Sequence, residues 1–322
     1  MEPRNTRRER ARVASRRGGV RGAGTCSADA WSARAAGSLR GSPGSVVPEL
    51  PEVEVTAREL ARRFTGSRVR ALRIFHRGFR LPVSAALPAA VLGQPVDGVG
   101  RRGKYLLWHF PNGVLLSHLG MSGAWRIHEP ESAPSRRPHD HVEIECADAL
   151  ARLNDPRRFG VVLWHPRTEG DIATHPLLAT LGIEPFDPRF DADWLVRHTR
   201  NQRSAIKSVL LAGRVVVGVG NIYASETLFE AGIHPATPAG RITRRRYVRL
   251  VDAVRTVLAQ AIAAGGSTLR DFSGADGAQG HYTNAARVYG RGGQPCLRCG
   301  TQIRRIVQTQ RATYFCPTCQ KS

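Results

Sequence analysis

Two closely spaced pairs of cysteines near the end of the chain constrain its fold more than any other feature. Cys296-x-x-Cys299 and Cys316-x-x-Cys319 are separated by sixteen residues and use four of the six cysteines in the 322-residue sequence. Two such pairs on a hairpin can place four thiolates around one zinc ion. Two disulfides or free thiols are the alternative. The spacing favours zinc, and a closed four-cysteine site stabilises its module rather than performing chemistry.

The charge balance indicates a polyanionic partner. The chain has 48 Lys and Arg residues against 26 Asp and Glu residues, a net charge of +22. This excludes an ordinary acidic cytosolic enzyme, and nucleic acid is the commonest polyanion that such a protein binds. No stretch approaches the ~20 apolar residues of a membrane span, so a transmembrane protein is also excluded. A hydrophobic fraction of 41% leaves room for two or three domains with a sizeable core.

Residues 1–47 differ from the rest of the chain. They contain ten arginines and three acidic residues, are rich in Gly, Ser and Ala, and lack apolar periodicity. We therefore expect this basic extension to be disordered. Three interpretations remain open: an arm that binds nucleic acid, an Arg-rich transit peptide, or a translation start assigned too early.

The next part of the chain predicts one helix followed by strands. Pro51 can open a helix, and apolar residues then recur at helical spacing at Val53, Ala57, Leu60 and Phe64. The segments 105–110 and 114–119 flank a Pro-Asn-Gly turn and predict a hairpin. Further strands are expected near 124–128, 142–146 and 160–165. This region predicts a β-sandwich or a barrel.

The second half of the chain is predicted to be helical. Residues 166–190 are rich in Pro, Gly, Thr and Asp and are typical of a linker. Helices are then expected at 191–198, 204–212, 221–231 and 243–264, followed by a polar, Gly-rich loop at 272–288. The final segment, 289–322, is a compact basic module. The fold class is therefore α+β with several domains.

Two further segments have compositions that suit nucleic-acid chemistry. Gly218-Val-Gly-Asn221 precedes an apolar helix, where Asn221 can cap the helix and backbone amides can face a phosphate. This signal is weak alone, but Arg200, Arg203 and Lys207 just upstream strengthen it. Asp155-Pro-Arg-Arg-Phe159 and the turn that carries Met121 offer side chains able to fill the space left by an extruded base. On sequence alone, Met and Phe at such positions, here Met121 and Phe159, are more often core residues.

Taken together, these segments resemble the formamidopyrimidine-DNA glycosylase family, part of a wider group that includes endonuclease VIII. The matching motifs occur in the family's order over residues 48–320: Pro48-Glu-Leu-Pro-Glu-Val-Glu54, Arg102-Gly-Lys-Tyr-Leu-Leu107, His118-Leu-Gly-Met-Ser-Gly123, His139-Asp-His141, Asp155-Pro-Arg-Arg-Phe-Gly160, Val217-Gly-Val-Gly-Asn-Ile-Tyr-Ala-Ser-Glu226, Val288-Tyr-Gly-Arg291 and Gln310-Arg-Ala-Thr313.

The resemblance implies a particular domain order and one structural Zn²⁺. It implies a catalytic β-sandwich at 48–174, a helix–two-turn–helix DNA-binding domain at 175–288 and a zinc finger at 289–322. It also implies a bifunctional DNA glycosylase and AP lyase of base excision repair. Such an enzyme removes oxidised purines (8-oxoguanine and formamidopyrimidines) from double-stranded DNA, and then cuts the abasic strand by β,δ-elimination.

The resemblance also implies which residues perform these steps. The catalytic positions of the family match Pro48 as nucleophile, Glu49 as the neighbouring acid, Lys104 and Arg311. The DNA-contacting and base-replacing positions match His139, Arg157, Asn221, Met121 and Phe159.

Two departures from the family's pattern are visible. Gln202 occupies a position that is usually basic, with Arg203 or Arg200 as the expected substitute. The segment 275–287, which covers the flipped base in the family, matches only loosely and leaves the preferred lesion open.

The expected chemistry bears on the N-terminal extension. The proposed intermediate is an iminium between the Pro48 nitrogen and the sugar C1′, which permits β-elimination, with Glu49 as the proton shuttle. A proline inside a chain has an amide nitrogen with no nucleophilic lone pair. We therefore expect that residues 1–47 are removed or never made, with a start assigned too early as the preferred interpretation.

Two rival functions remain from the sequence alone. One is an endonuclease VIII-like glycosylase for oxidised pyrimidines, and the other is a non-catalytic zinc protein that binds damaged DNA. In each case we expect a monomer located in the cytoplasm and associated with DNA.

Overall fold

Two antiparallel sheets form the first half of the protein in the computed structural model, which describes residues 47–267 and 286–322. The expectations for residues 1–46 and for 275–285 lie outside the described residues. One sheet has the strand order β1-β6-β7-β5 and the other β2-β3-β4-β8. The strands are β1 (Ala71–Ile74), β2 (Gly98–Arg102), β3 (Tyr105–Phe110), β4 (Gly113–His118), β5 (Ala124–His128), β6 (Asp140–Glu145), β7 (Leu150–Asn154) and β8 (Val161–Pro166).

The sandwich and the hairpin that the sequence predicts are confirmed. β3 and β4 pair around the expected turn, with Phe110 opposite Gly113. Strand β7 was absent from the sequence-based expectation. It is buried along most of its length, yet it carries Arg152, whose guanidinium pairs with Glu143 of β6 at 2.7 Å. This charged residue interrupts the apolar pattern by which a buried strand is detected.

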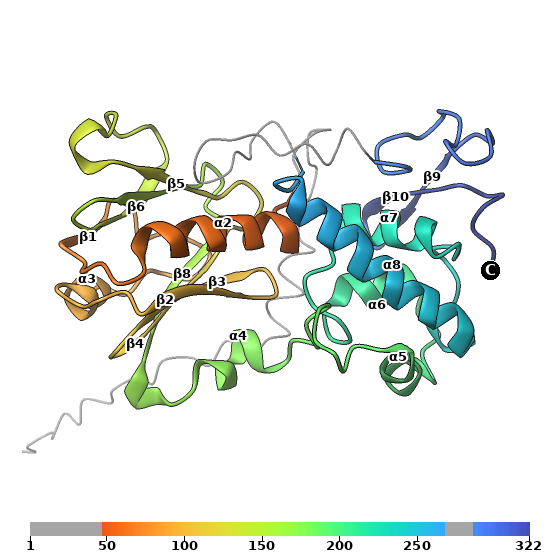
Figure 1. The fold of residues 1–322 in the computed structure, drawn as a ribbon, viewed down its shortest axis with the longest axis horizontal. Coiled ribbons are helices and arrows are strands. Elements are labelled where there is room, and N and C mark those ends of the chain that lie inside the picture. The colour runs from red at the N-terminus through yellow and green to blue at the C-terminus, as the bar shows by residue number, and fades with distance from the viewer. Residues whose placement is uncertain (1–46, 268–285) are drawn as a thin grey trace, which may run out of the picture.

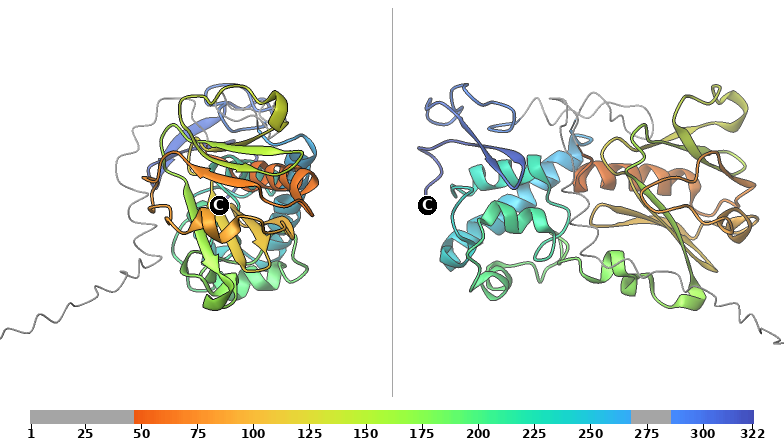
Figure 2. Two further views of the ribbon diagram at one scale, coloured as in Figure 1. Left: turned by 90° about the vertical axis from the view of Figure 1, so that its left-hand side faces the viewer. Right: turned by 180° about the vertical axis from the view of Figure 1, so that it is seen from behind.

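Helix α2 (Leu50–Phe64) joins the two halves of the molecule. Val53, Leu60 and Phe64 lie in the sandwich core together with the short helix α3 (Leu87–Val91). Leu50, at the start of the helix, belongs instead to the core of the helical half. Figure 1 shows α2 running from the sandwich to the end of α8, and the view from behind in Figure 2 shows the same arrangement. The first turn of α2 therefore lies where the two halves meet.

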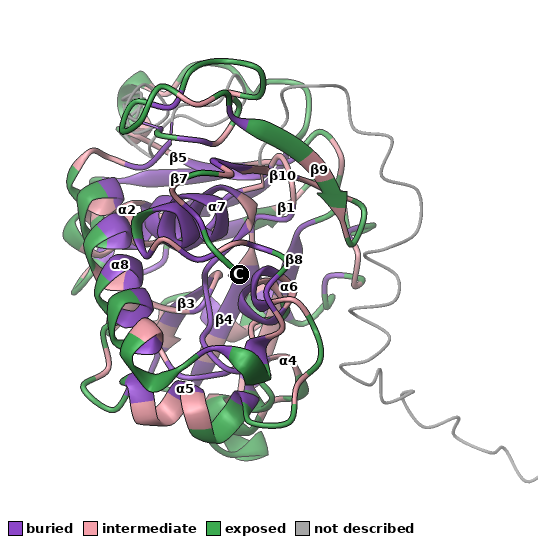
Figure 3. Ribbon diagram, turned by 90° about the vertical axis from the view of Figure 1, so that its right-hand side faces the viewer, coloured by how far each residue is buried: buried purple, intermediate pink, exposed green. Residues whose placement is uncertain are grey.

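The second half is helical, as expected. Its helices are α4 (Pro176–Ala179), α5 (Ala192–Thr199), α6 (Ile206–Ala212), α7 (Asn221–Glu230) and α8 (Arg244–Ala263). The predicted linker at 166–190 contains α4 and short 3₁₀ turns. Figure 3 shows buried and exposed turns alternating along α8, which is typical of a helix with one face on the core. Among the described residues, no helix combines the length and the apolar character that a membrane span needs.

A two-stranded hairpin ends the chain. Strands β9 (Arg304–Gln308) and β10 (Arg311–Phe315) pair in register, and Arg311 lies opposite Gln308. The base of the hairpin packs on α7 through a small core that contains Phe229, Ile303 and Cys316. β9 is mostly exposed, as Figure 3 shows. The packing against α7 brings the first residue of β10 toward the junction of the two halves.

Candidate active site

Glu49 connects the two halves of the molecule at their junction. It immediately precedes α2 and is only 2% exposed. Its Oε1 accepts the N–H of Ile222 at 3.0 Å, and its Oε2 accepts the N–H of Tyr223 at 3.4 Å. Both donors belong to the first turn of α7, whose amides have no partner within the helix. The carboxylate thus caps a helix that lies more than 170 residues away in the sequence.

The backbone before α7 leaves room for this carboxylate. A Cβ atom at Gly220 would lie 2.1 Å from the Cδ of Glu49. The glycine before Asn221 is therefore required by the close approach of a side chain. The sequence motif suggested a phosphate as the group that approaches here, and the structure places Glu49 against this glycine.

The environment of Glu49 favours its protonated form. Burial raises the pKa of the carboxyl above its usual value, and the neighbouring Glu52 acts in the same direction. Lys104 and the two N–H donors oppose this shift without cancelling it. A carboxyl group with a raised pKa is suited to donate as well as accept a proton.

Glu52 organises the residues around Glu49, and the sequence analysis did not identify it. Its Oε2 accepts the backbone N–H of Glu49 at 2.9 Å. Its Oε1 accepts the hydroxyl of Tyr223 and both the N–H and the hydroxyl of Ser267, each at 2.7 Å. The sequence signal was only an acidic residue in the first turn of a helix. The partners come from distant segments, so no local pattern could reveal this role.

Lys104 approaches Glu49 from the sandwich. It lies in the tight turn between β2 and β3, where it is half-buried. Burial lowers the pKa of its ammonium group; Glu49 counteracts this effect, and Arg311 adds to it. The three residues therefore interact electrostatically although they come from the start of α2, the β2–β3 turn and β10. The structure brings together these residues, which the sequence analysis named as catalytic.

A buried lysine holds the hairpin against the helical half. The Nζ of Lys207, on α6, donates to the carbonyl of Ala312 at 3.1 Å and to the hydroxyl of Thr313 at 2.7 Å. The Nδ2 of Asn221 donates to the same Ala312 carbonyl at 3.1 Å. The accepting residues, Ala312 and Thr313, directly follow Arg311 in the sequence. Its place just upstream of the Gly-rich motif predicted a contact with phosphate for Lys207. Instead it is fully buried, and burial lowers the pKa of its ammonium group to about 7.

Two turns at the edge of the sandwich are held together by Asp155. This fully buried carboxylate accepts the hydroxyl of Ser122 and the N–H of Gly160, both at 2.8 Å. The first bond reaches the turn that carries Met121, and the second lies next to Phe159. From the sequence, Asp155 is only the first residue of a turn. Because the buried carboxylate of Asp155 bonds to both turns, it fixes the relative position of Met121 and Phe159, the two candidate base-replacing side chains.

The exposed side of these turns carries the other candidates. Phe159 is 43% exposed, and the guanidinium of Arg157 lies over its ring at 4.8 Å. His139 is exposed and adopts a positive φ of 72°, and its carbonyl accepts the N–H of Asp155 at 3.0 Å. Met121 is half-buried. Phe159 is therefore not a core residue, which removes the structural alternative that the sequence left open for it.

The polar residues between α5 and α6 have a different environment. The Nε2 of Gln202 donates to the carbonyl of His198 at 2.8 Å, so this side chain caps the end of α5. The neighbouring Arg203 is exposed.

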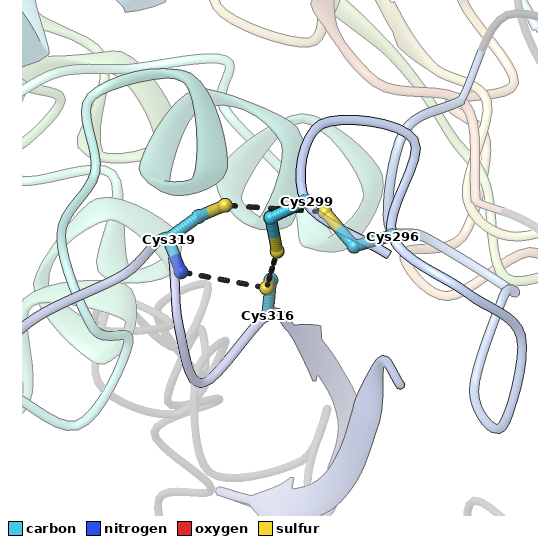
Figure 4. A group of neighbouring side chains, drawn as sticks. All are labelled: Cys296, Cys299, Cys316 and Cys319. Carbon is cyan, nitrogen blue, oxygen red and sulfur yellow. Dashed lines mark hydrogen bonds between the residues drawn. The ribbon is translucent and has the colours of Figure 1, made fainter. Parts of the chain in front are cut away.

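The four cysteines of the C-terminal module form one cluster. Their sulfur atoms all lie within 4.8 Å of one another, with Cys296 and Cys319 at 4.0 Å and Cys299 and Cys316 at 3.5 Å (Figure 4). A zinc ion with four sulfur ligands at about 2.3 Å requires sulfur–sulfur separations of about 3.8 Å. The cluster therefore fits one structural zinc, as the spacing of the cysteines predicted.

Family models match almost all of the described chain. Residues 47–162 match the formamidopyrimidine-DNA glycosylase N-terminal domain, and residues 181–273 match the H2TH domain of the same glycosylase. Residues 293–321 match a zinc finger found in FPG and IleRS.

Named relatives match over their whole length. The formamidopyrimidine-DNA glycosylases of Bordetella avium and Ralstonia nicotianae are 56% and 54% identical to this chain. Each match covers 85% of this chain and 100% of the relative.

Solved structures show the same fold. A variant of Lactococcus lactis Fpg in complex with DNA containing Fapy-dG aligns with a TM-score of 0.78 at 33% identity. The Lactococcus lactis Fpg complex with abasic-site DNA gives the same TM-score and identity, and a complex with DNA containing an oxidised pyrimidine gives 0.77 at 33%. These matches cover 85% of this chain and 100% of the other.

Proposed function

This chain belongs to the formamidopyrimidine-DNA glycosylase family, the DNA glycosylases of oxidised-purine repair, and we propose that it excises the damaged base with the amine of Pro48. The observation that carries the proposal is the position of Pro48. It directly precedes Glu49, whose buried carboxylate interacts with Lys104 on one side and the first turn of α7 on the other. The substrate is double-stranded DNA that contains an oxidised base or an abasic site.

The first step is extrusion of the damaged nucleotide from the duplex. This costs a few kcal/mol, because stacking and pairing are lost. Met121, Arg157 and Phe159 replace the extruded base. The two turns that carry these side chains are held together by Asp155, which keeps them side by side for this role. The exposed ring of Phe159, with the guanidinium of Arg157 above it, supports this role. His139, on the same side of the sandwich, binds the DNA beside them.

The second step is attack on the sugar. The Pro48 nitrogen forms a bond to C1′ while the bond from C1′ to the base breaks, and the electron pair leaves with the base, which takes up a proton. Opening of the sugar ring then gives an iminium ion. Glu49 supplies and recovers the protons, because it lies next to Pro48 and burial raises the pKa of its carboxyl above the usual value. Lys104 assists release of the base.

The third step is cleavage of the strand. The iminium acidifies C2′; loss of that proton expels the 3′ phosphate, and a second elimination expels the 5′ phosphate. Arg311 neutralises a phosphate during these eliminations, with Asn221 beside it. The Nδ2 of Asn221 donates to the carbonyl of Ala312, the residue after Arg311, and this contact supports the pairing. Arg203 contacts the phosphate backbone further from the lesion, and the adjacent Gln202 contacts it as well.

The reaction requires that Pro48 carries a free amine. A terminal amine has a reference pKa of about 7.7–8.0, so a useful fraction is unprotonated at neutral pH. With Val47 attached, the same nitrogen is an amide and cannot form the iminium. We therefore propose that the active form begins at Pro48. We also propose a monomer as the active species, and its DNA substrate supports a location at the bacterial chromosome.

Covalent trapping tests the proposal directly. A protein that begins at Pro48 is incubated with a duplex containing 8-oxoguanine while borohydride reduces the iminium. We expect a stable protein–DNA adduct, and we expect none with the 322-residue chain whose N-terminus has been verified by mass spectrometry. Acetylation of the Pro48 amine should abolish the adduct.

Two outcomes would contradict the proposal. Equal trapping by the verified full-length chain would show that Pro48 is not the nucleophile. Tight binding of the lesion duplex without excision by the Pro48 form would show that the protein recognises damage without cutting. Duplexes with an oxidised pyrimidine belong in the same experiment, because faster excision of that lesion would overturn the assignment to oxidised purines.

A further inference from the structure

One carboxylate outside the proposed catalytic group binds the turn that carries Lys104. Glu184 lies in the segment that connects the two halves of the molecule. Its Oε1 accepts the backbone N–H of Gly103 at 2.7 Å and the guanidinium of Arg102 at 2.8 Å. Its Oε2 accepts the guanidinium of Arg101 at 2.8 Å. The Glu184 carboxylate therefore binds three consecutive residues that immediately precede Lys104.

The same contacts extend to the helix that follows Pro48 and Glu49. The Nε of Arg101 donates to Glu54 of α2 at 2.7 Å, and its Nη1 donates to the carbonyl of Gly103 at 2.9 Å. The side chain of Arg101 is 9% exposed, whereas Glu54 is 20% exposed and Glu184 is 25% exposed. Two carboxylates thus hold one nearly buried guanidinium, one from the helix after Glu49 and one from the connecting segment.

The turn itself has little freedom to move. Gly103 has a positive φ of 59°, and a Cβ atom there would lie 2.5 Å from the side chain of Val217. Arg102 also donates to the carbonyls of Leu181 and Gly182, at 3.0 and 2.6 Å. The β2–β3 turn is thus pressed against the helical half and bound to it by several hydrogen bonds.

We propose that Glu184 is a positioning residue for base excision, which sets the place of Lys104 relative to Pro48 and Glu49. This inference rests on the proposed function, since it assumes that Lys104 assists release of the base. Glu184 does not reach the reacting atoms. It acts through the backbone of Gly103, and through Arg101 it holds the turn in register with the start of α2.

Loss of the carboxylate would affect geometry more than binding. Without the carboxylate, one of the two oxygens that accept from Gly103, Arg101 and Arg102 is lost, and the two arginines lose a shared counter-charge. When one charged partner of a partly buried network is removed, the remaining groups are destabilised. The β2–β3 turn, and Lys104 with it, then becomes free to move. A small displacement of a catalytic group is sufficient to slow a reaction strongly, because the reacting atoms must meet in a narrow range of distances. None of the residues that Glu184 binds is among the proposed DNA contacts, so the affinity for DNA should change little.

The test is a double-mutant cycle in single-turnover kinetics. Zinc-loaded protein with a free Pro48 amine is compared as wild type, Glu184→Gln, Lys104→Ala and the double variant. The substrate is an 8-oxoguanine duplex at saturating enzyme. We expect Glu184→Gln to slow base release by about tenfold, since misplacement of a catalytic group costs ~1.4 kcal/mol or more of transition-state stabilisation. Affinity for an uncleavable abasic-analogue duplex should change by less than twofold. The double variant should be no slower than Lys104→Ala alone.

A matched control separates positioning from a general loss of stability. Glu143 also binds two arginines, Arg73 and Arg152, but in the other sheet of the sandwich. Glu143→Gln should leave the rate of base release within twofold of wild type at a temperature where all variants are folded. If Glu184→Gln does not fold, the cycle is repeated with Glu184→Asp, which keeps the charge but is too short to reach all three donors.

The possible failures are distinguishable. A wild-type rate for Glu184→Gln together with a slow Lys104→Ala would overturn the role of Glu184 and leave the proposed function intact. Additive losses in the double variant would also overturn it, because Glu184 would then act independently of Lys104. A wild-type rate for Lys104→Ala would remove the assigned role of Lys104 and the present inference with it.

Discussion

The carboxylate of Glu49 accepts the N–H of Ile222 at 3.0 Å, so the residue next to Pro48, the proposed nucleophile, caps helix α7 of the other half of the molecule. The first turn of a helix carries partial positive charge, which favours the ionised carboxylate. Burial and Glu52 act in the opposite direction and raise the pKa of Glu49 overall. The proton on Glu49 is therefore controlled by groups from both halves.

Replacement of Glu49 by Gln should affect base removal more than strand cleavage. The amide keeps the size of the side chain but cannot transfer a proton. We expect excision of 8-oxoguanine to fall by about 10²–10⁴-fold, the usual contribution of general acid–base catalysis. Cleavage of a preformed abasic site should fall less, because its aldehyde needs no departing base. Single-turnover assays on the two duplexes measure the difference, and equal losses would contradict the assigned role.

The two exposed turns of the sandwich provide a second prediction. Phe159→Ala and Met121→Ala should slow excision of a lesion in duplex DNA, because less of the cost of extrusion is offset. The expected loss of ~1.4 kcal/mol of transition-state stabilisation lowers the rate of excision about tenfold. Cleavage of an abasic site should change much less, since no base has to leave the stack. The rates on both substrates are compared for each variant, and parallel losses would mean that these side chains only support the fold.

The zinc cluster provides a third prediction. Cys316→Ser should release the metal and unfold the hairpin, because a structural zinc supplies folding free energy directly, roughly 10–16 kcal/mol in small zinc modules. Arg311 would then leave the site, and affinity for lesion-containing DNA should collapse while the sandwich stays folded. Metal analysis, circular dichroism and DNA-binding titrations check these points. Full DNA binding by a metal-free variant is the result that would refute this role.

Lys207 provides a prediction about pH. Its pKa is about 7 in the folded protein, against a reference of 10.5, so between these values the unfolded chain binds one more proton than the folded one. Stability contributed by this group therefore rises with pH across that window and is lowest below pH 7. The melting temperature of wild type minus that of Lys207→Met should increase between pH 6.5 and pH 9. A difference that is constant or falls with pH would show that Lys207 stays charged.

Local patterns in the sequence were sufficient for most of the fold. The helical spacing of Val53, Leu60 and Phe64 predicted α2, because the core that this helix covers requires one apolar face. The two cysteine pairs predicted the zinc module, since zinc geometry needs that spacing. Strand β7 was missed because its buried Arg152 depends on a partner in another strand.

The candidate site was predictable to a different extent. The family resemblance names residues only where they lie in motifs. Of these residues, Glu49, Lys104 and Arg311 interact electrostatically in the structure. Glu52, Asp155, Glu184 and Lys207 were missed or interpreted differently. Their roles depend on contacts across 30 to more than 200 residues of sequence, such as Glu52 with Ser267 or Asp155 with Ser122. A single acidic or basic residue gives no local sign of such a partner.

The close approach of Glu49 to Gly220 also restricts how this sequence can diverge over time. Alanine at position 220 would place its Cβ 2.1 Å from the Cδ of Glu49, so the Glu49 side chain would have to move from its position against α7. A shorter acid, in turn, would no longer reach the N–H of Ile222. A change at either position therefore disturbs the contact between Glu49 and the first turn of α7. Two residues on opposite sides of the junction thus constrain each other's side chains.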